Sequence, residues 1–451
     1  MGVVADQLVA RASLDRPFEY DAAQLRPLWL QAAKERLRER AEQIPALKAR
    51  VEQADVDAVT DLAALIPFLF SHDTYKSYPR DFLDKGRWGL LAKWMSSVST
   101  QRIPDLDYSG VETQDDWARL LGESGYPVYA SSGTSGKSSF LPATPSDREF
   151  TMGCLVRSLT WQQGVQEGMH FPLLTLAPST GDSRALEYYR RVAQTYGDPE
   201  RTHFLTDEPV RLHDLNALMR LSKAVGDGTA APEEIASFQQ DQRSRSERID
   251  GEWDRLAKVA ESLEGERVIL QGFWPQQFTL VERLRALGHS RLPLDPTSIL
   301  SAGGGTKGTN LPADFQQQVL EFYGLPESRQ ASGYGMSELS AALPEIDGRY
   351  QLQPWIIPLV LTEEGTELAT PDAEGRLEGR FAFLDLALEG RWGGLISGDR
   401  VVVDPTGPGF AIAAGSVMRY SDLRGGSDDR LTCAGTVGAF VTGLTDTQVN
   451  A

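Results

Sequence analysis

The residues best suited to chemistry form a short run rich in glycine and hydroxyl side chains. Residues 131–138 read Ser-Ser-Gly-Thr-Ser-Gly-Lys-Ser and follow residues 127–130, which have the pattern of a short buried strand. Glycines let a backbone turn its N–H groups toward an anion, and hydroxyls and a lysine add donors and positive charge. The run indicates a phosphate-binding loop made of Ser132, Gly133, Thr134, Ser135, Gly136 and Lys137. A mobile Ser/Gly linker has a similar composition, and the GxxxxGK[ST] spacing of the common P-loop is absent.

Four further motifs follow this loop in order, at residues 301–308, 332–338, 396–400 and 425–435. Each is a weak signal alone, since a glycine triplet can be only a turn and Gly398-Asp399 only a hairpin turn. Taken together and in this order, they resemble the adenylate-forming superfamily of acyl- and aryl-CoA synthetases, nonribosomal peptide adenylation domains and luciferases. The chain is most similar to its phenylacetate-CoA ligase-like and acyl-protein synthetase members.

The resemblance implies an ATP-dependent acid ligase with an α/β fold. Such an enzyme converts a small carboxylic acid to an acyl-adenylate, releases pyrophosphate, and passes the acyl group to a thiol, an amine or an acyl carrier. The fold would be a layered adenylation domain with a β-rich subdomain. A non-catalytic or partner-dependent homologue that binds nucleotide or acyl ligand without turnover is the alternative.

The reaction explains why these residue types are needed. Attack of a carboxylate on the α-phosphate of ATP joins two anions, so Mg²⁺ and positive donors must lower their repulsion. The resemblance implies that Thr134, Ser135 and Lys137 hold the β- and γ-phosphates. It implies that Ser337 contacts the α-phosphate and that Glu338 helps to hold Mg²⁺, which prefers oxygen ligands. Glu338 could instead be only a charge at a helix N-terminus.

The resemblance also implies where the rest of the nucleotide and the acid would bind. The segment Gly303, Gly304 and Gly305 would let the adenine lie against backbone, with Tyr334 of the Tyr334-Gly335 pair stacking on it. Asp399 would accept hydrogen bonds from both ribose hydroxyls. The acid pocket would include Phe273, Trp274 and Ala302. Aromatic residues such as Tyr334, Phe273 and Trp274 are also common in an ordinary core.

The C-terminal region departs from the large members of the family. Gly426 and Thr432 stand where basic residues are common, and the chain ends at Ala451, sixteen residues after Gly435. We therefore expect the C-terminal lobe, with its adenylate-forming lysine, to be largely absent. Cys433 could accept the acyl group, because a thiolate is a strong nucleophile toward an acyl-adenylate. It could equally be a small buried residue, and no base stands near it in the sequence.

Bulk properties are those of a cytoplasmic globular enzyme. The net charge of −18 disfavours binding to nucleic acid, and the hydrophobic content of 41% is ordinary. No apolar run reaches the roughly 20 residues that span a bilayer, and the first residues do not form a secretory signal. The two cysteines and five histidines have no metal-site spacing, so no metal beyond Mg²⁺ is expected.

Three regions are expected to position these motifs. Residues 1–100 have a mostly helical pattern with a break at Pro45, and residues 71–73 look like the cap of a helix. Residues 101–400 form the ATP-binding core, with a β-rich subdomain over about 350–400, and residues 401–451 form a shortened hinge segment. Within the core we expect strands at 171–177, 267–271, 297–302 and 327–332, helices at 279–287 and 313–323, and a surface helical insertion at 215–265.

Overall fold

The computed structural model describes most of the chain. It covers residues 2–54, 56–131, 137–181, 183–209, 228–304, 311–404 and 409–423, with single positions at 211, 213, 221, 224 and 225. Five phosphate-loop residues (132–136), Gly305, the motif at 425–435 and Cys433 lie outside the described residues.

The chain divides into two compact units, each assembled from separate stretches of sequence. As far as the structure describes them, residues of 1–130, 138–162 and 333–427 form the first unit, and residues of 131–137 and 163–332 form the second. Neither unit coincides with one of the three ranges expected from the sequence. The functional division at residues 100 and 400 stays a prediction.

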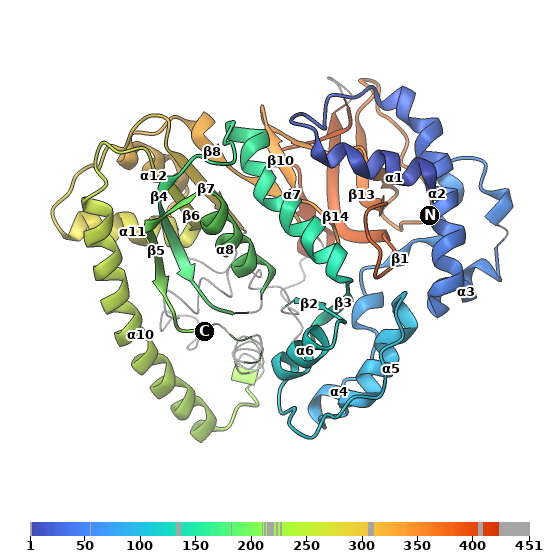
Figure 1. Cartoon of the computed structure of the whole chain (residues 1–451), viewed down its shortest axis with the longest axis horizontal. Helices are drawn as coiled ribbons and strands as arrows, with labels where there is room; N and C mark the ends of the chain where they lie inside the picture. The colour runs from blue at the N-terminus through green and yellow to red at the C-terminus, as the bar shows by residue number, and fades with distance from the viewer. Residues whose placement is uncertain are drawn as a thin grey trace. The chain divides into compact units, whose positions relative to one another are not determined.

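The second unit is built around a parallel sheet of five strands in the order β5-β4-β6-β7-β8 (Figure 1). The strands are β4 (Phe171–Pro178), β5 (Gly197–Thr206), β6 (Ile269–Phe273), β7 (Ile299–Gly303) and β8 (Gln330–Ala331). Successive strands are connected through α8 (Arg184–Tyr196), α10 (Pro232–Glu261), α11 (Trp274–Ala286) and α12 (Phe315–Tyr323). This alternation is the layered α/β arrangement that the sequence predicts.

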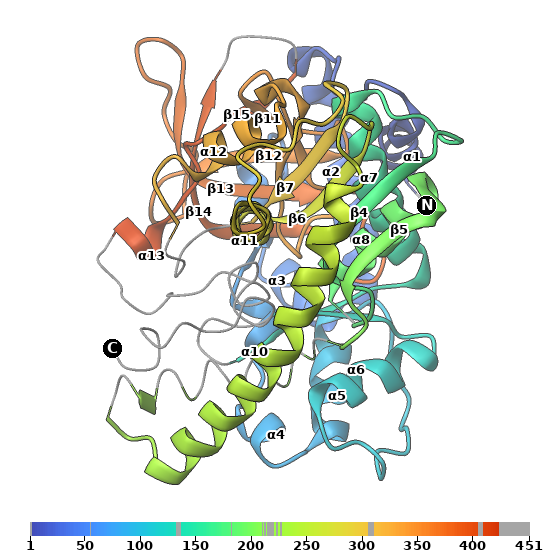
Figure 2. The ribbon, with the colours of Figure 1, turned by 90° about the vertical axis from the view of Figure 1, so that its left-hand side faces the viewer.

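Two expectations in this unit were wrong in part. The helix α10 is not simply a surface insertion, because Ile249, Trp253 and Leu256 are buried in the hydrophobic core of the unit. Their spacing of four and three residues places them on one helical face, so the C-terminal half of this long helix (Figure 2) packs into the core. Only two residues of the expected strand at 327–332 are strand, because a 3-10 turn at Glu327–Arg329 precedes β8.

Helices dominate the N-terminal part of the first unit, as expected. They are α1 (Val3–Ala10), α2 (Ala22–Gln43), α3 (Pro45–Val51), α4 (Asp81–Asp84), α5 (Trp88–Val98), α6 (Gln114–Glu123) and α7 (Pro145–Gln163). The break at Pro45 is confirmed, since Pro45 is the first residue of α3 and Ile44 before it is extended. The capped helix expected from residues 71–73 was wrong in part. Phe70–Ser71 forms strand β1, which pairs in parallel with β14, and only a 3-10 turn, Thr74–Lys76, follows Asp73, whose side chain makes no cap.

The rest of the first unit is a sheet that runs β12-β13-β14-β15-β11-β10-β9, with β1 and β16 also paired to β14. Its later strands are β9 (Gly333–Tyr334), β10 (Leu343–Ile346), β11 (Arg349–Gln351), β12 (Ile356–Leu361), β13 (Leu377–Asp385), β14 (Gly394–Asp404), β15 (Ala411–Ala413) and β16 (Met418–Arg419), followed by α13 (Tyr420–Leu423). The β-rich character expected beyond residue 350 is confirmed. Strands β2 (Val128–Ser131) and β3 (Ser139–Pro142) form a separate pair on either side of the phosphate-loop residues.

Candidate functional site

Two predicted nucleotide-binding residues, Tyr334 and Asp399, are in direct contact in the first unit. The Tyr334 hydroxyl on β9 donates a hydrogen bond of 2.6 Å to Oδ2 of Asp399 on β14. The ring of Tyr334 lies in an aromatic cluster, with centroids 5.9 Å from Tyr350 and 6.0 Å from Phe381. The motifs at 332–338 and 396–400, which are far apart in the sequence, therefore meet at one place.

The environment keeps Tyr334 protonated. Burial and the neighbouring carboxylate of Asp399 raise the pKa of the Tyr334 phenol well above its ordinary value. The hydroxyl is thus a donor to Asp399 at neutral pH. Asp399 is also oriented by its backbone N–H, which donates to the Ser397 hydroxyl at 3.1 Å. Because Gly398 and Asp399 lie inside β14, the hairpin-turn alternative for this motif was wrong.

The Ser337-Glu338 segment is a turn rather than the start of a helix, so the helix N-terminal alternative for Glu338 was wrong. Arg391 donates to the backbone carbonyls of Ser337 and Glu338, both at 3.2 Å. The backbone N–H of Ser340 donates to the carboxylate of Asp385 at 2.7 Å. Backbone contacts on both sides therefore fix the turn that carries the half-buried Glu338 side chain.

A single carboxylate at this turn fits the coordination chemistry of Mg²⁺. Proteins usually hold this ion through one or two carboxylates together with the phosphates of a substrate. Among the described residues, no group of three or more His, Cys, Asp or Glu side chains could hold a metal ion. A role for Glu338 in binding Mg²⁺ together with phosphate oxygens stays a prediction.

His72 is a neighbour of this site that no motif in the sequence indicates. Its backbone N–H donates to the Ile396 carbonyl at 3.1 Å. His72 therefore takes part in the hydrogen bonding between β1 and β14. Its ring lies 3.9 Å from the position that a Cβ on Gly398 would occupy. Burial lowers the pKa of His72, and the opposing effect of Asp73 and Glu338 offsets only part of that shift. A lone histidine in a helical-looking segment has no sequence signal that would reveal this placement.

The glycine motif and the candidate acid-pocket residues belong to the second unit. Gly303 ends β7, and Gly304 has a φ of 82°, a conformation that favours glycine. Ala302 is buried in β7. These features fit a tight turn directly after a buried strand, as the sequence predicts.

The two aromatic candidates lie in the core of this unit. Trp274 is 4% exposed and packs edge-on against Phe315 at 5.5 Å. Phe273 is half-buried and packs against Tyr189 at 5.9 Å. Trp274 thus has the environment of an ordinary core residue, and a role for either aromatic in an acid pocket stays a prediction. Cys154, the other cysteine, is buried in α7.

Comparisons with known proteins identify the fold. No model of a known protein family matches the chain, and no curated protein matches it. Solved structures of 2-hydroxyisobutyryl-CoA ligase do match. The complex with R3-HIB-AMP in the postadenylation state superposes with a TM-score of 0.52 and 14% identity, over 90% of this chain and 69% of the ligase. Its open conformation with 2-HIB-AMP and CoA gives a TM-score of 0.51 and 14% identity, over 90% of this chain and 78% of the ligase.

The chain has the adenylate-forming ligase fold. The α/β class is confirmed, and the resemblance drawn from the ordered motifs is confirmed at the level of the fold. At 14% identity the likeness concerns the fold alone, so the roles of individual residues rest on their own geometry. None of the helices in the described part of the chain combines the length and apolar character needed to cross a membrane.

Proposed function

We propose that this protein uses ATP and Mg²⁺ to convert a carboxylic acid to an acyl-adenylate, with release of pyrophosphate, and then transfers the acyl group to a thiol or an amine. The hydrogen bond between Tyr334 and Asp399 carries this proposal. It joins two residues that separate motifs assign to one nucleotide. The fold of an acyl-CoA ligase, solved with an acyl-adenylate and with CoA, supports the same reaction class.

Each part of the site has a chemical task in this proposal. Asp399 accepts hydrogen bonds from the ribose hydroxyls, and Tyr334 orients that carboxylate while its ring borders the adenine. Glu338 binds the Mg²⁺ that neutralises the phosphates, and Ser337 contacts the α-phosphate. Lys137, with the hydroxyls of the phosphate loop, holds the β- and γ-phosphates. The glycines at 303–305 admit the adenine close to backbone.

The decisive experiment is ATP–pyrophosphate exchange measured across a panel of aliphatic and aromatic acids. We expect exchange that depends on both Mg²⁺ and one class of acid. In Asp399→Ala, nucleotide binding should weaken by about 2–3 kcal/mol, the usual contribution of hydrogen bonds to a charged acceptor. A 2′,3′-dideoxy ATP analogue should show no further loss in that variant. A fully additive loss would place the ribose elsewhere.

A partner-dependent or non-catalytic homologue is the second candidate. Gly426 and Thr432 favour it, because they stand where large members of the family carry basic residues. In that case the protein would bind ATP with Mg²⁺ but catalyse no exchange with any acid. Restoration of exchange by a separate protein would point to a partner that supplies the missing groups.

A further inference from the structure

Arg391 is a buried cation next to the turn that carries Glu338. Arg391 is only 2% exposed. The guanidinium donates to the carbonyl of Pro142 at 2.9 Å and to the carbonyls of Ser337 and Glu338. Pro142 is the last residue of β3, the strand that follows the phosphate loop. One side chain therefore connects that strand to the Ser337-Glu338 turn.

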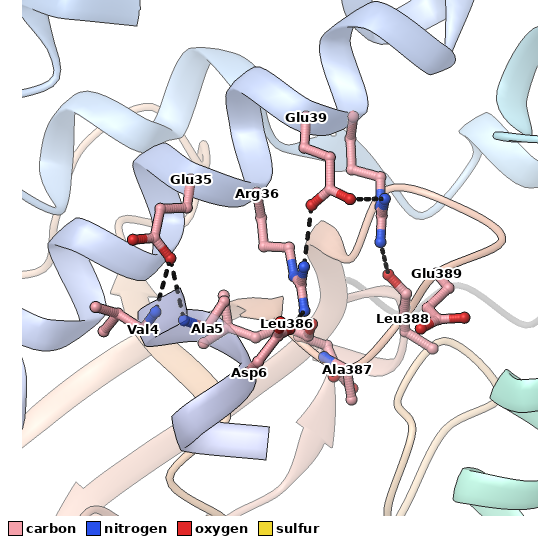
Figure 3. A network of polar contacts seen from close by, with 12 residues as sticks. Val4, Ala5, Asp6, Glu35, Arg36, Glu39, Leu386, Ala387, Leu388 and Glu389 are labelled. Atoms are coloured by element: carbon pink, nitrogen blue, oxygen red, sulfur yellow. Dashed lines mark hydrogen bonds and ion pairs between the residues drawn. The ribbon is translucent and has the colours of Figure 1, made fainter. Parts of the chain in front are cut away.

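The charge of Arg391 has an unusual environment for a buried guanidinium. Within the described part of the chain, all its hydrogen bonds go to neutral backbone carbonyls, and no carboxylate lies within ion-pair distance. Buried charges are normally paired, because removing a charge from water is costly. By contrast, the two buried arginines of α2 in the same unit, Arg36 and Arg40, both form ion pairs with Glu39 (Figure 3).

Residues 386–390, which precede Arg391, are anchored by side chains of two helices. These contacts fix the backbone position from which the Arg391 side chain extends. Arg36 donates to the Leu386 carbonyl at 3.0 Å (both labelled in Figure 3), and Arg40 donates to the Leu388 carbonyl at 3.4 Å. The carboxylate of Asp147 then accepts the backbone N–H groups of Glu389 and Gly390, both at 2.7 Å. The loop that ends at Arg391 is thus anchored to two helices, α2 and α7.

We propose that Arg391 is a positioning residue that aligns Glu338 with the phosphate-loop strand, so that the Mg²⁺ and the phosphates of MgATP are bound together. The inference rests on the proposed function. Its fork-shaped guanidinium can reach carbonyls on two separate segments, which the single ammonium of a lysine cannot do in the same geometry. Its positive charge, which also acts on the buried carboxylate of Asp385 without a direct ion pair, favours the binding of a polyphosphate nearby.

The test compares Arg391→Lys with Arg36→Lys. Both remove a buried guanidinium from the same unit, and Arg36 holds the loop that ends at Arg391, but Arg36 does not contact Ser337 or Glu338. Binding of ATP to the full-length protein is measured by calorimetry over a range of Mg²⁺ concentrations, and thermal unfolding is recorded in parallel. No turnover is needed for this readout. Asp385→Asn, which disturbs the same turn through Ser340, serves as a second variant if Arg391→Lys does not fold.

Arg391→Lys should raise the Mg²⁺ concentration for half-maximal ATP binding by about tenfold, or about 1.4 kcal/mol, the scale of a lost charged hydrogen bond. Binding of adenosine should not change. In a Glu338→Gln background the same substitution should add nothing further. An unchanged Mg²⁺ dependence in folded Arg391→Lys, or an equal change in Arg36→Lys, would overturn the inference.

Normal MgATP binding by the wild type without acid-dependent exchange would refute only adenylation. Absence of MgATP binding would overturn both proposals.

Discussion

The hydrogen bond between Tyr334 and Asp399 makes a quantitative prediction for Tyr334→Phe. The substitution removes one hydroxyl and leaves the ring in its cluster with Tyr350 and Phe381. The lost bond is short, at 2.6 Å, and its acceptor is a carboxylate. A hydrogen bond to a charged group contributes about 1.5–3 kcal/mol, so the free energy of unfolding should fall by that amount. Urea denaturation with an unchanged m-value would measure it.

A double-mutant cycle isolates the bond from other effects of the substitution. Asp399→Asn should cost less in the Tyr334→Phe background than in the wild type, and the difference is the coupling energy. Tyr350→Phe is the matched control, because its ring lies in the same cluster and its hydroxyl has no hydrogen bond to a described residue. That variant should change stability by less than about 0.5 kcal/mol. A coupling energy near zero between Tyr334 and Asp399 would refute the reasoning.

The pH dependence gives an independent check with a definite sign. The pKa of Tyr334 is raised well above 10.0 in the folded protein, while in the unfolded chain the phenol titrates near that ordinary value. Above pH 10 the unfolded state therefore binds fewer protons than the folded state, and stability falls as the pH rises. The wild type should lose stability more steeply than Tyr334→Phe in that range. Parallel curves for the two proteins would contradict the assigned environment of the phenol.

The sequence predicted three of the five strands of the α/β core because these strands are buried on both faces. Strands β4, β6 and β7 are short apolar runs separated by helical patterns, which is a strong signal. Strand β5 was missed, because it lies at the edge of the sheet and its sequence, Gly-Asp-Pro-Glu-Arg-Thr-His-Phe-Leu-Thr, is mostly polar. An edge strand buries fewer side chains, so its pattern does not stand out from a loop.

The sequence named Tyr334, Glu338 and Asp399 but not the contacts among their neighbours. Contact between Tyr334 and Asp399 depends on the strand order β9-β10-β11-β15-β14, which no local pattern reveals. Arg391 was missed for a different reason. It donates to backbone carbonyls, which every residue has, so the types of its partner residues do not reveal the interaction in the sequence.

Three further predictions test other parts of the site. Lys137→Ala should weaken ATP binding at least tenfold and AMP binding much less, because the lost charge faces the outer phosphates; equal losses in calorimetry would exclude that role. The second concerns His72, whose pKa is lowered from 6.5, so that the folded protein favours the neutral ring. As the pH drops below 6.5, the free energy of unfolding should decrease more steeply in the wild type than in His72→Gln, as measured by urea denaturation. The third concerns Cys433. If it receives the acyl group, protein incubated with ATP and the right acid should gain the acyl mass as a hydroxylamine-labile thioester. Cys433→Ser should keep pyrophosphate exchange, because adenylation precedes attack by the thiol, yet form no thioester. Normal product formation by Cys433→Ser, with no adduct on the wild type, would mean that the adenylate passes directly to an external thiol or amine.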